Sequence, residues 1–187
     1  MKEPKLYKIC RPFFYAILMS YFNPTIINKE VIPGDGKIII AGNHKNALDP
    51  VLVDACTKRV VYTLAKKALF DSHFGWFFRG IGSIPVEKGA LDNAVNHLNH
   101  GCAINVSPEG TRNKTSEVLL PFKTGAVVMA KKTGSLIIPY SITGDYVFRS
   151  KNLKIEFGEP LNVSDLEVDD ANELLYDSVK KLIIKNK

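Results

Sequence analysis

The apolar positions of this chain fall into short runs that turn residues interrupt. Such runs predict buried strands, because a strand that is covered on both faces carries few polar positions. We expect strands at residues 37–42, 59–64, 102–106, 136–140 and 153–157.

Between these runs, apolar residues recur with the spacing of amphipathic helices. The spacing predicts helices at residues 49–56, 69–79, 90–98, 123–132 and 171–183. Gly101 and Gly134 are placed to end two of them, and Ser164 with Glu167 forms a capping-box pattern ahead of the last. The alternation of strands and helices predicts an α/β fold, a single domain with a mixed, largely parallel sheet flanked by helices.

The N-terminal residues 7–22 begin basic and become apolar and aromatic. Their apolar run is shorter than the roughly 20 residues that a bilayer span needs, and no small-residue cleavage site of a signal peptide follows it. We expect an interfacial helix, with residues 1–30 as an amphipathic membrane-associating segment ahead of an α/β domain at residues 31–187. The expected lipid-facing residues are Phe13, Phe14, Tyr15, Leu18 and Phe22, and the expected head-group contacts are Lys2, Lys5, Lys8 and Arg11. The alternative is a core helix docked on the domain.

Composition narrows the classes of partner. The 187 residues are 45% hydrophobic, as in an ordinary globular domain, and carry a formal net charge of +6. This charge favours an anionic partner, and because no nucleic-acid-binding signature is present we expect anionic lipid or an acidic carrier protein and no nucleic acid. The cysteines Cys10, Cys56 and Cys102 fit no metal or disulfide spacing, and His97 with His100 lacks a third ligand. We therefore expect reduced thiols and no metal.

A histidine and an aspartate stand at a predicted strand-to-helix turn. His44 follows the strand at residues 37–42, and Asp49 with Pro50 has the pattern of a helix start, with Asp49 as the N-cap. In a continuous helix, residues five apart lie roughly 140° from one another and cannot pair. Across a turn, the Asp49 carboxylate can accept a hydrogen bond from the His44 ring and leave the other ring nitrogen free to take a proton. The alternative is that Asp49 only caps the helix.

A second polar segment follows the predicted strand at residues 102–106. It offers the Glu109 carboxylate, the flexible Gly110 backbone, the Thr111 hydroxyl and the Arg112 guanidinium. Arginine binds phosphate through two parallel hydrogen bonds, and glycine lets a backbone approach an anion closely. Taken singly, such a loop is more often an ordinary turn.

The two segments together resemble the phospholipid and glycerol acyltransferase family, and within it the bacterial 1-acyl-glycerol-3-phosphate acyltransferases. His44 and Asp49 match the first block of the family and residues 108–112 the third; residues 82–88 and 136–139 resemble the second and fourth. The chain departs from the family pattern at Lys88, where arginine is usual, and at Ser107 and Asn113, which replace a bulky apolar residue and a serine. These departures concern the acceptor rather than the reaction class.

The resemblance implies transfer of a fatty acyl group from a thioester of acyl-carrier protein or coenzyme A to the 2-hydroxyl of 1-acyl-glycerol 3-phosphate. The product is phosphatidic acid, in phospholipid biosynthesis. His44 and Asp49 are the expected catalytic pair, with His44 as the base. Lys88 and Arg112 are expected to bind the acceptor phosphate. Glu109 is expected to shape the loop, or to hold the glycerol hydroxyls or Arg112. Backbone N–H groups near Gly110 are expected to bind the phosphate or the oxyanion, and Thr111 is expected in the same substrate site. We expect no cofactor or metal.

The resemblance also implies a peripheral or monotopic protein on the cytoplasmic face of the cell membrane. Two alternatives stay open. One is acylation of glycerol 3-phosphate or of another lysophospholipid by the same pair of residues. The other is a non-catalytic peripheral protein that binds anionic lipid through its positive charge.

Overall fold

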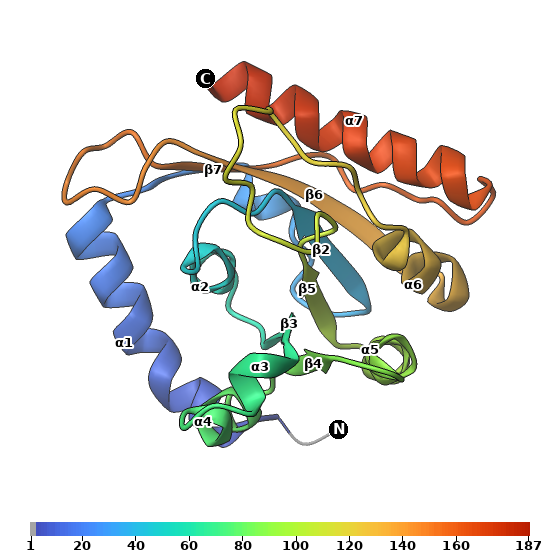
Figure 1. Cartoon of the computed structure of the whole chain (residues 1–187), viewed down its shortest axis with the longest axis horizontal. Helices are drawn as coiled ribbons and strands as arrows, with labels where there is room; N and C mark the ends of the chain where they lie inside the picture. The colour runs from blue at the N-terminus through green and yellow to red at the C-terminus, as the bar shows by residue number, and fades with distance from the viewer. Residues whose placement is uncertain (1–2) are drawn as a thin grey trace.

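The computed structural model describes residues 3–187 as one sheet with helices on both faces (Figure 1). The strands are β1 (Thr25–Ile27), β2 (Ile38–Gly42), β3 (Val61–Lys66), β4 (Ile84–Val86), β5 (Ala103–Val106), β6 (Leu136–Thr143) and β7 (Lys154–Phe157). The helices are α1 (Lys5–Phe22), α2 (Asp49–Ala55), α3 (Lys67–Phe70), α4 (Gly75–Gly80), α5 (Ala90–Asn99), α6 (Gly125–Thr133) and α7 (Val168–Asn186), with a 3-10 turn, η1 (Lys29–Val31). Over the described residues the sheet has seven strands in the order β1-β7-β6-β2-β5-β3-β4. It is mostly parallel, with β7 antiparallel to β6, so the expected fold class is confirmed.

The central strand β2 explains how the two faces are filled. Its five residues are all buried, and alternate side chains point to opposite faces of a sheet. Ile39 packs in the cluster that includes residues of α5, α6 and α7, whereas Ile38 and Ile40 pack in the cluster that includes Leu52 of α2 and Leu18 of α1. Figure 1 shows these two sets of helices on opposite sides of the sheet.

The parallel strands also decide where the polar loops meet. β2 pairs in parallel with β5 and β6, and β5 pairs in parallel with β3. The carboxyl ends of these strands therefore open at one edge of the sheet, which is where open α/β sheets bind ligands.

Several local expectations are wrong. Residues 69–79 form two short helices, α3 and α4, because the Ser72 hydroxyl donates to the Leu69 carbonyl (2.6 Å) and the Gly75 N–H to the Ser72 carbonyl (2.9 Å), which closes a turn between them. The capping box is also wrong: α7 begins at Val168 with Glu167 as its N-cap and no side-chain cap. The strand expected at residues 59–64 is β3, two residues further on, and β1 and β4, each three residues long, were not expected.

Helix α1 docks on the domain and still presents an apolar outer face. Leu18 is 3% exposed within the core, and Phe22 packs against the same cluster, so neither points outward as expected. Arg11 donates to the backbone carbonyls of Asp54 and Thr57 rather than pointing to a head group. Phe13, in contrast, is 67% exposed. Lys2, a further expected head-group contact, lies outside the described residues.

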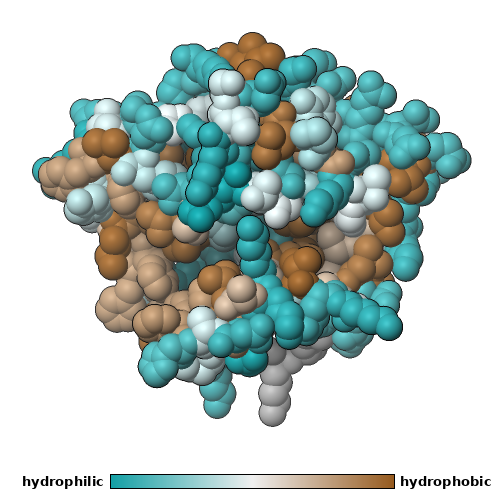
Figure 2. Space-filling view, viewed as in Figure 1, coloured by the Kyte–Doolittle hydropathy of each residue, from teal (hydrophilic) through white to brown (hydrophobic). Residues whose placement is uncertain are grey.

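The outer face of α1 continues onto its neighbours. The exposed large apolar residues of α1 are Ile9, Phe13, Phe14, Tyr15, Ile17 and Tyr21. Trp76 of α4 and Phe148 of the β6–β7 connection are exposed as well. Figure 2 shows brown side chains gathered on the side of the view where Figure 1 places α1. Within residues 3–187, no helix has both the length and the hydropathy of a membrane span.

Buried and exposed apolar residues of α1 should contribute differently to the stability of the fold. We expect Leu18→Ala to lower the free energy of unfolding by about 2–5 kcal/mol, because it leaves a cavity in the core. Phe13→Ala is the matched control on the same helix, and as an exposed position it stays within about 0.5 kcal/mol of the wild type. Urea denaturation measures both. Equal losses for the two variants would contradict the docked arrangement.

Candidate active site

The buried carboxylate of Asp49 organises the turn between β2 and α2. The Asp49 side chain is fully buried and the His44 side chain is 20% exposed, with 3.0 Å between Asp49 Oδ2 and His44 Nδ1. The same oxygen accepts the backbone N–H groups of Lys45 (2.7 Å) and Asn46 (2.8 Å). Asp49 Oδ1 accepts the Tyr146 hydroxyl at 2.7 Å. The hydrogen bond expected between His44 and Asp49 is therefore present.

This geometry also decides between the two interpretations of Asp49. The N-cap of α2 is Leu48, and Asp49 is the first helical residue. No side chain caps the N-terminus of this helix. The Asp49 carboxylate instead points back to the turn that precedes the helix. The interpretation of Asp49 as a simple helix cap is therefore wrong. Because a carboxylate only accepts hydrogen bonds, it holds the proton of a neutral His44 on Nδ1 and leaves Nε2 as the acceptor.

Two neighbouring residues fix the turn to the sheet. The Asn43 side chain accepts the Ile142 N–H (2.7 Å) and donates to the Ile142 carbonyl (2.9 Å), which ties the end of β2 to β6. Gly42 lies so close to Tyr140 that an added Cβ would be 2.3 Å from its carbonyl oxygen. The chain therefore enters the His44 turn along a path that a larger residue at position 42 would block.

The second buried carboxylate, Glu109, joins the two loops. Its Oε1 accepts the His44 N–H (2.7 Å) and its Oε2 accepts the Leu120 N–H (2.9 Å). Burial raises the pKa of the Glu109 carboxyl, and the hydrogen bonds from Leu120 and His44 oppose that rise. Glu109 therefore shapes the loop and leaves Arg112 and any substrate phosphate to other partners.

A cavity of about 520 Å³ has His44 in its lining. Its apolar wall includes Phe14 and Tyr15 of α1, Val51 of α2, Leu64 of β3 and Phe77 of α4. Its polar lining includes Ser107, Gly110, Arg112, Lys123 and Lys66. Figure 2 shows the molecule hollowed beside the apolar side chains of the α1 side. A largely apolar cavity with few polar groups, in this size range, suits a small amphipathic ligand.

The cations of this cavity are only partly those that the sequence indicated. Within residues 3–187, the cations in its lining are Arg11, Lys66, Arg112 and Lys123. Neither Arg112 nor Lys123 is in an ion pair with a described carboxylate. Lys123 extends along Gly110, where an added Cβ would be 2.8 Å from Lys123 Nζ, and Gly110 itself has φ +67°. The Arg112 guanidinium and the Lys123 ammonium are thus free to bind an anion.

The other residues predicted for the substrate site are Thr111, Gly110 and Lys88. Thr111 is exposed beside Arg112, and the Gly110 N–H is used within its own turn, where it donates to the Ser107 carbonyl (2.9 Å). Lys88 is exposed two residues after the end of β4. It is absent from the described lining of the large cavity, although Val86 of β4 contributes to it.

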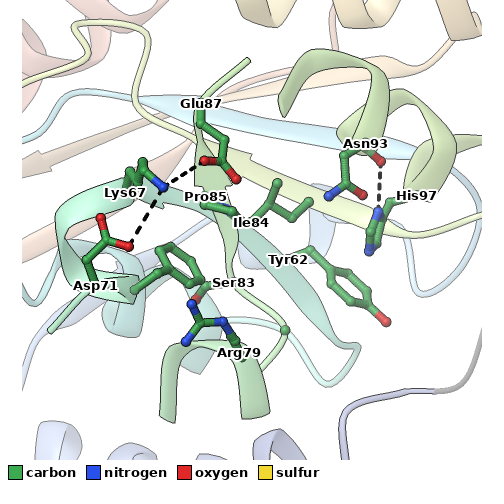
Figure 3. Close-up of a pocket in the computed structure, with 12 residues that line it drawn as sticks. Tyr62, Lys67, Asp71, Arg79, Ser83, Ile84, Pro85, Glu87, Asn93 and His97 are labelled. Atoms are coloured by element: carbon green, nitrogen blue, oxygen red, sulfur yellow. Dashed lines mark hydrogen bonds and ion pairs between the residues drawn. The ribbon is translucent and has the colours of Figure 1, made fainter. Parts of the chain in front are cut away.

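Residues of the second block also line a smaller pocket of about 370 Å³ at the β4 edge (Figure 3). There, Lys67 forms ion pairs with Glu87 (3.1 Å) and Asp71 (3.7 Å). The His97 Nδ1 lies 2.8 Å from the Asn93 carbonyl (Figure 3). Because Lys67, Asp71 and Glu87 already have partners, and His44 and Arg112 are not part of its described lining, this pocket is the weaker candidate for a site. The part of the chain that the structure describes contains no group of three residues placed to hold a metal.

Two residues of the site, Tyr146 and Lys123, are not indicated by the sequence patterns. Tyr146 is 97 residues from Asp49 along the chain, and no local pattern marks it. Lys123 stands at the expected start of a helix, so its position predicts no role in the site. The signal that could have indicated one is its place in the same segment as Arg112, 11 residues further along the chain. Lys66, the last residue of β3, also lines the cavity.

Comparisons with known proteins concern the family and the fold of this chain. The model of a family described as Acyltransferase matches residues 23–143. A 1-acyl-sn-glycerol-3-phosphate acyltransferase of Bacillus subtilis is 28% identical over 171 residues, which cover 86% of this chain and 84% of that protein. The Escherichia coli protein of the same name is 30% identical over 154 residues, covering 74% and 62%. The crystal structure of the 1-acyl-sn-glycerophosphate acyltransferase PlsC from Thermotoga maritima has the same fold, with a TM-score of 0.80 at 22% identity over 96% of this chain and 78% of that one.

The double role of Glu109 predicts a specific loss of stability. Glu109→Gln keeps one accepting oxygen and turns an amide N–H₂ toward a backbone N–H, so we expect the free energy of unfolding to fall by about 1–3 kcal/mol. Hydrogen exchange at the His44 and Leu120 amides should accelerate. Glu117→Gln, at an exposed position of the same segment, is the control. Unchanged exchange at both amides in Glu109→Gln would show that Glu109 does not hold the two loops.

Proposed function

The chain belongs to the acyltransferase family, and we propose that it transfers a fatty acyl group from a thioester to the 2-hydroxyl of 1-acyl-glycerol 3-phosphate, which yields phosphatidic acid. The observation that carries this proposal is the His44–Asp49 hydrogen bond at 3.0 Å, in the lining of a cavity with apolar walls and free cations. The names of the relatives support the choice of acceptor.

The chemistry needs a base at the acceptor hydroxyl. His44 Nε2 takes the hydroxyl proton as the oxygen forms a bond to the thioester carbonyl carbon. The tetrahedral intermediate then expels the thiolate, which receives the proton from the imidazolium. A positioned base is worth roughly 10²–10⁴-fold. Asp49 orients the ring and stabilises the imidazolium, as the acid member of a Ser-His-Asp triad does, with the acceptor hydroxyl in place of the serine.

The acceptor phosphate is assigned to the unpaired cations. Arg112 offers two parallel hydrogen bonds to phosphate oxygens, and Lys123 a point charge. Both line the cavity that includes His44. Lys88 stays a prediction for the same phosphate, from the exposed end of the second block. The carboxylate of Glu109 does not compete for these cations, because its oxygens accept backbone N–H groups.

The acyl chain reaches this site from a lipid surface. Phe14 and Tyr15 are 40% and 44% exposed on the outer face of α1, and both also line the cavity. We therefore place α1 and its neighbours in the head-group region, with the net charge of +6 favouring anionic lipid. This corresponds to a peripheral or monotopic protein on the cytoplasmic face of the cell membrane. Acyl-carrier protein and coenzyme A thioesters both fit as donors, and no cofactor is required.

The first functional test addresses the base. In vesicles, with each donor crossed against 1-acyl-glycerol 3-phosphate, glycerol 3-phosphate and other lysophospholipids, we expect transfer to the first acceptor. His44→Ala should lower kcat by about 10²–10⁴-fold. Asp49→Asn should be comparably severe because the ring loses its orientation. His100→Ala, at an exposed position, is the control.

Two results would count against this assignment. Full activity in Asp49→Asn would rule out His44 and Asp49 as a catalytic dyad. Vesicle binding without turnover in the wild type would favour the non-catalytic alternative, and preference for another acceptor in the panel would correct the substrate.

The second functional test addresses the phosphate. We expect Arg112→Ala to raise the KM of the acceptor about 10–100-fold and the KM of the donor little, because a hydrogen bond to a charged group contributes about 1.5–3 kcal/mol. Lys123→Ala should act in the same direction. Lys88→Arg should be tolerated or improve binding, since it restores the residue usual in the family. Equal rises of the two KM values in Arg112→Ala would assign Arg112 to structure instead.

A further inference from the structure

The connection between β6 and β7 joins the dyad to the outer surface. This β6–β7 loop (residues 144–153) turns Tyr146 inward and leaves Val147 and Phe148 55% and 56% exposed. Figure 1 shows the loop, in orange, beside the carboxyl end of α1. One short segment therefore contacts both the candidate active site and the surface that we assign to lipid.

On its inner side, the loop completes the surroundings of Asp49. The Tyr146 hydroxyl donates to Asp49 Oδ1 at 2.7 Å, whereas His44, Lys45 and Asn46 all donate to Oδ2. Burial, and then the charge of Asp49, raise the pKa of the Tyr146 phenol, so the hydroxyl keeps its proton and remains a donor. Among the described residues, Tyr146 is the only side chain that donates to Oδ1. It therefore orients the carboxylate that orients His44.

On its outer side, the loop rests on the last turn of α1. The Phe148 ring lies 4.7 Å from the Tyr21 ring, and the Arg149 N–H donates to the Tyr21 carbonyl at 2.8 Å. Arg149 and Lys151 at the tip have left-handed backbones (φ 47° and 58°), which non-glycine residues rarely adopt. The docked arrangement of the loop is thus open to stabilisation from outside.

The surface chemistry of the tip identifies what can stabilise it. Exposed Val147 and Phe148 extend the apolar face of α1, where the Phe148 ring contacts Tyr21. The exposed cations Arg149 and Lys151 follow them along the loop, and the exposed Asp145 that precedes them lies 3.9 Å from Lys45 Nζ. Apolar and aromatic residues bordered by cations match the boundary between acyl chains and anionic head groups. The occupant that fits is therefore the same anionic lipid surface that meets α1.

We propose that Tyr146 is a positioning residue for the His44–Asp49 dyad, and that a lipid surface which buries Val147 and Phe148 holds Tyr146 in place. Acyl transfer is then faster at a bilayer than in solution, because lipid shifts the loop toward its docked arrangement. The inference rests on the proposed acyl transfer and adds to it a link between lipid contact and chemistry.

The inner contact is tested by removing one hydroxyl. Tyr146→Phe keeps the ring packed against Phe22, whose centroid is 5.4 Å away, and deletes the donor to Asp49. We expect kcat to fall about tenfold with both KM values unchanged. The acid limb of the pH–rate profile should move to higher pH, because Asp49 without this donor attracts the imidazolium proton more strongly. Tyr62→Phe removes a hydroxyl from the smaller pocket and should behave as wild type.

Two results of that experiment would overturn the positioning role. One is a Tyr146→Phe profile that coincides with wild type in kcat and in pH dependence. The other is a change in KM alone, which would make the loop a binding element. Absence of transfer by the wild type with every acceptor would instead refute the proposed function itself, so the two failures are distinguishable.

The outer contact is tested with a short-chain, water-soluble acceptor, with and without anionic phospholipid vesicles. Wild-type kcat should rise severalfold when vesicles are added. Phe148→Ser should lose most of that rise while α1 still binds the vesicles, as flotation measures. Combined with Tyr146→Phe, it should cause no further loss, because both act through one hydrogen bond. A Phe148→Ser variant with the full vesicle-dependent rise, or additive losses in the double variant, would overturn the link.

Discussion

The buried negative charge of Asp49 is the constraint on which the site depends. An ionised carboxylate removed from water is strongly unfavourable unless hydrogen-bond donors surround it. Here four donors surround it: the His44 ring, the N–H groups of Lys45 and Asn46, and the Tyr146 hydroxyl. Satisfying this one carboxylate folds the turn after β2, starts α2 at Asp49 and holds the β6–β7 loop. The same contacts leave His44 with an acceptor nitrogen, so the stability of the turn and the orientation of the ring have one cause.

The other buried carboxylate of the site, Glu109, has a structural role and leaves substrate binding to other residues. Because Glu109 accepts two backbone N–H groups, it draws no cation to itself. Arg112 and Lys123 consequently stay unpaired in the cavity lining. An acceptor with a phosphate and an acyl chain finds cations, a base and apolar walls in one cavity. Phe14 and Tyr15 connect those walls to the outer face of α1, so the lipid need not leave an apolar environment to reach His44.

The sequence predicts the parts of this arrangement that short-range patterns encode. Buried apolar runs predict the long strands, and a histidine and aspartate at a strand end predict the dyad, because the turn brings them together. Hydropathy alone cannot separate Leu18 from Phe13, since burial depends on which side of α1 meets the domain. Nor can it find Tyr146, whose partner is 97 residues away. The break between α3 and α4 depends on the Ser72 side chain, which competes with the helix for a carbonyl.

The role of the dyad depends on Asp49 setting the protonation pattern of the His44 ring. Nitrogen-15 NMR of histidine-labelled protein, with His44 assigned by its absence in His44→Ala, measures that pattern directly. For the neutral ring, we expect a proton on Nδ1 and an unprotonated Nε2, with this preference lost in Asp49→Asn. A His44 protonated on Nε2 in the wild type, or a tautomer unchanged in Asp49→Asn, would contradict it.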